Sequence, residues 1–149
     1  MTHKTVIIVV GTGEGDKPES LIPLALREQL IANWQASMAA EEVDHRPVVK
    51  LSVPMIGHTW LITEMKPDDQ DILFGLCDLE MGFPELGYVS LGELASVRAK
   101  FGFGVERDAG FTASYPLSVY TKAASINGRI VEDDGLLKAA AEALADDDK

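Results

Sequence analysis

The chain contains a single cysteine, Cys77, among its 149 residues. A single thiol cannot form an intramolecular disulfide, and a chain with one cysteine cannot build a metal site from several cysteines. Because Cys77 lies inside the apolar run Ile72 to Leu79, we expect a buried structural thiol. Long apolar runs are missing near the N-terminus, where Val6 to Val10 is too short for a signal-peptide core or a membrane span. These absences predict a cytoplasmic protein with no membrane partner.

Positive charge is scarce as well. The 13 lysines and arginines are outnumbered by 24 aspartates and glutamates, which gives a formal net charge of −11. Since no basic cluster exists to neutralise phosphates, we expect no direct binding to nucleic acid. Between Glu132 and Lys149, seven carboxylates against two lysines account for −5 of this charge, and such acidic tails are most often solubilising. A DNA mimic needs carboxylates along one rigid face, a pattern that the core lacks, so mimicry is only an alternative.

No specific catalytic, cofactor or metal motif is present. The glycine-rich segment Gly11 to Lys17 follows a strand-like run, Thr5 to Val10. Asp16 and Pro18 stand where a phosphate-binding Walker loop needs glycine and Ser or Thr, and the dinucleotide fingerprint lacks its third glycine. We interpret the segment as a linker. His45 lies in a polar, linker-like context without metal-ligand spacing, so we expect neither a cofactor nor a metal.

The remaining sequence alternates between strand-like and helical patterns. Pro23 suits the first position of a helix that runs to about Ala40, and a charged linker, Glu41 to Pro47, follows it. Turn-forming residues 66–71 predict a hairpin between two of the strands. The predicted strands are Val48 to Val53, Thr59 to Met65, Ile72 to Asp78 and Leu86 to Val89.

The segment from residue 85 to 108 reads as strand, helix and strand. Ser90 and Glu93 have the spacing of a capping box, and the helical pattern continues from Leu91 to a stop at Gly102. Alternation around Val105 then predicts a short, half-exposed strand. Near the C-terminus we expect a helix from Leu117 to Ile126, stopped by Asn127 and Gly128, and a last helix from Gly135 to Ala145, capped by Asp133 or Asp134.

These elements predict an α+β fold. A small antiparallel β-sheet packs against two main helices, which start at Pro23 and Leu91, and a C-terminal helix is added. We expect three parts: an N-terminal extension (1–19), a core α+β domain (20–115) and an acidic helical C-terminal extension (116–149).

Glu64, Asp78 and Glu85 are three carboxylates that would need to converge to form a shared metal or acid–base site. The hairpin argues against it, because Glu64 pairs close to residue 72 or 73 while Asp78 pairs with His58 or Thr59, ~20 Å away at 3.3 Å per residue. His58 and Asp78 are expected to form a structural pair. An enzyme whose site is assembled from His58, Asp78 and Glu85 stays an alternative.

A partner-binding surface is the other interpretation of the polar residues of the sheet. Arg, Tyr and Trp are common anchors of interfaces. A charged strand at residues 106–108 is also typical of a protected sheet edge. The candidates for partner contact are Trp60, Glu64, Asp78, Glu85, Tyr88, Glu106 and Arg107.

Several blocks of the chain resemble an uncharacterised bacterial family, the domain of unknown function 2958. The phrase ELGYVSLGEL with VERD downstream carries the resemblance, together with blocks at residues 47–51, 59–64 and 74–79, so roughly residues 21 to 111 are covered. The resemblance implies a cytoplasmic protein often carried on plasmids and other mobile elements of bacteria. It brings no established reaction, cofactor or catalytic residue.

The leading hypothesis is therefore a non-enzymatic, acidic accessory protein of a mobile genetic element that acts by binding another protein. A host defence or DNA-processing factor is the candidate target. The alternatives are a small hydrolase or nucleotide-binding enzyme using His58, Asp78 and Glu85, and a DNA mimic.

Overall fold

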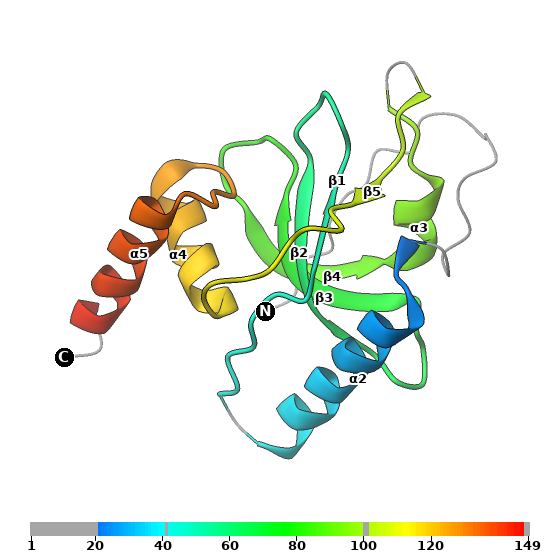
Figure 1. Ribbon diagram of the computed structural model, residues 1–149, viewed down its shortest axis with the longest axis horizontal. Helices are drawn as coiled ribbons and strands as arrows, with labels where there is room; N and C mark the ends of the chain where they lie inside the picture. Colours follow the sequence, from blue (N-terminus) through cyan, green and yellow to red (C-terminus); the bar gives the residue numbers. More distant parts are fainter. Residues whose placement is uncertain (1–20, 41, 100–101, 148–149) are drawn as a thin grey trace.

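A five-stranded antiparallel sheet with the strand order β4-β3-β2-β1-β5 forms the centre of the protein (Figure 1). The computed structural model describes residues 21–40, 42–99 and 102–147, so the predicted strand Thr5 to Val10 and the glycine-rich segment lie outside the described residues. The strands are β1 (Val49–Ser52), β2 (Thr59–Met65), β3 (Ile72–Asp78), β4 (Glu85–Ser90) and β5 (Glu106–Arg107). The helices within the described residues are α2 (Leu24–Ala39), α3 (Leu91–Ser96), α4 (Leu117–Asn127) and α5 (Asp134–Asp147). The predicted α+β class is confirmed.

Helices cover both faces of the sheet (Figure 1). Successive strand residues point to opposite faces. Trp60 and Ile62 therefore join one core with α2 and α3, while Leu61 joins a second core with α4 and α5. The predicted C-terminal extension thus supplies the helices of the second face. Each large apolar side chain that is buried on either face contributes about 2 kcal/mol to the free energy of folding, and these contributions stabilise the packing of helices on the sheet.

The predicted β2–β3 hairpin forms with the predicted strand ends. Asp78 pairs with Thr59, as expected, but Glu64 pairs with Phe74 and not with residue 72 or 73. The reason is a bulge between Ile62 and Glu64, which places an extra residue, Thr63, in β2. A bulge re-aims side chains, and here it turns Glu64 toward the face that carries Phe74.

Helix α3 is shorter than predicted. Ser90 caps it as expected, since its Oγ accepts a hydrogen bond from the Glu93 amide at 3.1 Å. A second cap comes from Asp71, which binds the Ser90 hydroxyl (2.6 Å) and the Gly92 amide (2.7 Å). The helix ends at Ser96 and not near Gly102, because buried Val97 turns to an extended conformation and the Arg98 guanidinium binds its carbonyl at 2.6 Å.

Both predicted C-terminal helices are present. Helix α4 ends in a left-handed residue, Gly128, with φ of 74°, a conformation that glycine adopts without steric cost. Asp133 is the capping residue of α5, because its Oδ1 accepts from the Leu136 amide at 3.0 Å. The loop between the helices is tied to the sheet by Asp78, whose Oδ2 accepts from the Ile130 amide at 2.9 Å.

Candidate functional site

The seven residues predicted to contact a partner do not form one surface. Trp60 is 1% exposed and belongs to the core between the sheet and helices α2 and α3, so its ring cannot meet a partner in this fold. Tyr88 lies on β4, at one edge of the sheet, where its ring packs against Phe74 with a centroid separation of 5.1 Å. Glu106 and Arg107 form β5 at the opposite edge. The expectation of a charged edge strand is thus confirmed, and the two edges are separate surfaces.

His58, Asp78 and Glu85 lie at the same end of the sheet, as strand pairing shows. The Asp78 carboxylate is 3% exposed and is used structurally, since it accepts hydrogen bonds from the amides of Glu80 and Ile130, both at 2.9 Å. The expected contact with His58 is replaced by these amides. His58 packs edge-on against the Trp60 ring instead, at a centroid separation of 6.3 Å. Glu64 is at the other end of the strand pair, so the four polar residues do not converge.

Two loops and the C-terminal end of α4 meet at the Asp78 end and carry exposed apolar side chains. A Cβ added to Gly57 would lie 2.1 Å from Glu80 Oε1, so the β1–β2 turn touches the β3–β4 loop. A Cβ added to Gly128 would lie 3.3 Å from the carbonyl oxygen of Gly82, so that loop also touches the end of α4. Figure 1 shows these segments projecting beyond the strand ends.

We name this region the loop-end surface and define it by Met55, Met81, Phe83 and Ile126. Their exposed fractions are 81%, 65%, 65% and 60%. Met55 also adopts a positive φ of 75°. Glu80, which lies against Gly57 of the same β1–β2 turn, has a positive φ of 58°. Non-glycine residues pay about 1 kcal/mol or more for this conformation, and such strain concentrates at functional sites. The sequence did not point to these residues, because an exposed methionine or phenylalanine in a loop has no periodic signature.

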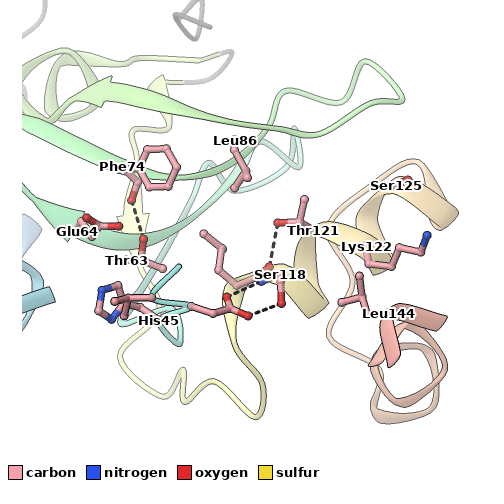
Figure 2. Close-up of a pocket in the computed structure, with 13 residues that line it drawn as sticks. His45, Thr63, Glu64, Phe74, Leu86, Ser118, Thr121, Lys122, Ser125 and Leu144 are labelled. Carbon is pink, nitrogen blue, oxygen red and sulfur yellow. Dashed lines mark hydrogen bonds between the residues drawn. The ribbon is translucent and has the colours of Figure 1, made fainter. Parts of the chain in front are cut away.

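A pocket of about 510 Å³ lies on the second face of the sheet, between β2, β3, β4 and α4 (Figure 2). Phe74 and Leu86 form its wall on the sheet side, and Leu117 and Leu144 come from α4 and α5. Figure 2 shows Glu64 and His45 at one end of the pocket and Lys122, Ser125 and Leu144 at the other. The pocket therefore has apolar walls and two polar ends.

The end with Glu64 contains a small polar cluster. Ser37 Oγ on α2 lies 2.9 Å from His45 Nε2, and the Ser37 side chain also hydrogen-bonds Glu64. Burial raises the pKa of Glu64 above its ordinary value, while the Ser37 hydrogen bond and the positive field of His45 partly offset this effect. A carboxyl group with a perturbed pKa in a pocket marks a candidate functional position.

This cluster is not a Ser-His-acid triad. In such a triad the carboxylate orients the histidine through its second ring nitrogen. Here Glu64 contacts the serine, so the order of the three groups is histidine, serine, glutamate. The cluster can hold Glu64 in place and transmit a proton along hydrogen bonds, but it does not assemble an activated nucleophile.

Val43, Asp44 and His45, from the segment predicted as a charged linker, build one side of the pocket. Asp44 accepts hydrogen bonds from the amide and the hydroxyl of Ser118, at 3.1 and 2.5 Å, and thereby caps the N-terminus of α4. The His45 carbonyl accepts from the Leu117 amide at 2.8 Å. These contacts join residues more than 70 positions apart, so no local pattern in the sequence could reveal them.

The fold and its surfaces define a small α+β protein with a sheet covered on both faces, an exposed apolar end and a mixed pocket. Residues 21–131 match the family described as "Protein of unknown function (DUF2958)", and the chain belongs to this family. The expected family is confirmed, and the match continues beyond residue 111 into the predicted C-terminal extension. No curated protein and no solved structure matches the chain.

Two further properties concern only the part of the chain that the structure describes. Its histidine, cysteine, aspartate and glutamate side chains form no group of three or more that could hold a metal ion. Its helices are all too short or too polar to cross a membrane.

Proposed function

We propose that the protein acts by binding another protein through the loop-end surface. The observation that carries this proposal is the placement of four large, exposed apolar side chains on two touching loops and the adjoining C-terminal end of α4. Exposed apolar patches on a folded domain commonly mark interaction sites, and methionines adapt their shape to a partner. The positive φ of Met55 supports the same interpretation, since it holds an apolar side chain outward at a cost in stability.

The charge around the loop-end surface suggests the chemistry of the partner. Glu80 and Glu85 are exposed beside it, Arg129 adds one positive charge, and the whole chain carries −11. A partner with an apolar contact surrounded by basic residues complements this arrangement. Proteins that process DNA have basic surfaces, which agrees with the proposed role as an accessory protein of a bacterial mobile element that targets a host defence or DNA-processing factor.

The proposal is tested by affinity capture from bacterial lysate with two matched double variants. Met81→Ser with Phe83→Ser alters the loop-end surface, while Leu24→Ser with Met38→Ser removes equally exposed apolar side chains from α2. We expect wild type and the α2 variant to retain the same protein, and the loop-end variant to lose it at least tenfold. Capture should weaken as salt is raised, because surface charges are screened.

The outcome also separates the alternatives. Equal retention by both double variants, or no retained protein with wild type, contradicts the proposal. A retained DNA-binding protein that releases the chain when DNA is added would favour DNA mimicry. In plasmid-transfer and phage-challenge assays, the loop-end variant should lose the effect of the wild-type protein while the α2 variant keeps it.

A further inference from the structure

We propose that the pocket on the second face of the sheet binds a small organic amine with an apolar body, such as an arylalkylamine. This site is separate from the loop-end surface: its walls come from the sheet, α4, α5 and the segment before β1. It would give the protein a small-molecule ligand in addition to a protein partner.

The size and walls of the pocket fit such a molecule. A volume of about 510 Å³ lies within the range of roughly 300–1,000 Å³ that is typical of ligand sites. Phe74 is half-buried and offers a ring for edge or face contact, and Leu86 and Leu117 continue the apolar wall. An aromatic ring with a short aliphatic chain can bury most of its surface here.

The distribution of charge in the pocket favours an amine at the β2 end. Glu64 lies there, and its carboxylate is already partly removed from water. The other acidic residue of the pocket, Asp44, is occupied by the amide and hydroxyl of Ser118. Lys122 lies at the opposite end and pairs with Asp147 at 3.3 Å. An ammonium group beside Glu64 would be attracted to the carboxylate and distant from the lysine, and His45 would be the basic side chain nearest to it.

The position of Glu64 is fixed before any ligand arrives. The bulge in β2 turns its side chain toward the pocket, and Ser37, hydrogen-bonded to His45, holds the carboxyl group. A positioned carboxylate loses little conformational entropy on binding, which favours affinity for a small ligand. The same cluster couples binding to protonation, because an ammonium ion stabilises the ionised form of Glu64 and opposes the effect of burial.

The test is ligand-observed NMR and calorimetry on the full chain with phenethylamine and with 3-phenylpropionate, a carboxylate of similar size. We expect the amine to bind and the carboxylate to bind at least tenfold more weakly. Glu64→Gln should reduce affinity for the amine about tenfold or more, since it removes a charge-assisted contact. Glu142→Gln, on the exposed side of α5, is the matched control and should leave affinity unchanged.

A pH series gives a second readout. Amine affinity of the wild type should fall as pH is lowered through the raised pKa of Glu64, while Glu64→Gln should show a flatter profile. Asp44 and Lys122 face the same pocket in both proteins, so the difference between the profiles reports on Glu64 together with His45, which interacts with it. Binding of neither probe, preference for the carboxylate, or equal affinity of Glu64→Gln and wild type would overturn the proposal.

Discussion

Replacing Asp78 by asparagine should loosen the connection between the sheet and the α4–α5 loop. The Asp78 side chain is 3% exposed and its two oxygens accept from the Glu80 and Ile130 amides, both at 2.9 Å. Asparagine keeps one acceptor but points an NH₂ group at the other amide. One charge-assisted hydrogen bond, worth about 1.5–3 kcal/mol, is lost, and a buried N–H is left without an acceptor at a further cost of about 1 kcal/mol. We expect a total loss of roughly 2.5–4 kcal/mol.

Urea denaturation measures this loss directly. The corresponding fall in melting temperature is about 5–15 °C for a protein of this size. Hydrogen exchange at the Ile130 amide should accelerate more than exchange in β2, because this amide loses its acceptor. Asp69→Asn is the matched control, because the Asp69 side chain is exposed and accepts a long hydrogen bond, 3.3 Å, from the Asp71 amide. If Asp78→Asn and Asp69→Asn lose similar, small amounts of stability, the structural role assigned to Asp78 is refuted.

Three further predictions concern the sheet, the α3 cap and the pocket. Gly75→Ala should lower the free energy of unfolding by about 3 kcal/mol or more, because the new Cβ would lie 2.0 Å from the Leu61 carbonyl oxygen. Gly110→Ala should change it little, because its Cβ would make only an ordinary contact, 3.6 Å from Asp108 Oδ1, and equal urea midpoints would contradict this. Ser90→Ala should cost about 1 kcal/mol in the same assay through loss of the cap on α3, and an unchanged midpoint would argue against that cap. For Glu64, the folded pKa lies above the unfolded value near 4.5, so the folded state binds more protons between the two values and loses stability as pH rises through that window. Glu64→Gln should therefore gain stability relative to wild type from pH 4 to pH 7 in parallel denaturation curves, and a constant difference would contradict the raised pKa.

Local patterns in the sequence predicted much of the fold. The ends of β2 and β3 follow from β-favouring residues bounded by turn residues 66–71, and the stop of α4 follows from Gly128, which adopts the required left-handed conformation. Ser90 revealed the start of α3 for the same reason, since a cap acts within one turn. Such features depend only on neighbours in the chain.

The features that could not be predicted depend on contacts between distant segments. The bulge at Thr63 shifts the partner of Glu64 by one residue, and no local pattern encodes it. The early end of α3 depends on burial of Val97 in the core. The pocket requires Asp44 to cap α4 from 74 residues away, and the loop-end surface requires two loops to meet the end of α4.

The most direct test of the proposed binding surface is photocrosslinking in living bacteria. A photoreactive phenylalanine analogue is placed at position 83, within the loop-end surface, or at position 107, on the β5 edge of the sheet. The proposal predicts that position 83 crosslinks to one discrete protein and that position 107 does not. A crosslink formed at position 107 and absent at position 83 would contradict it.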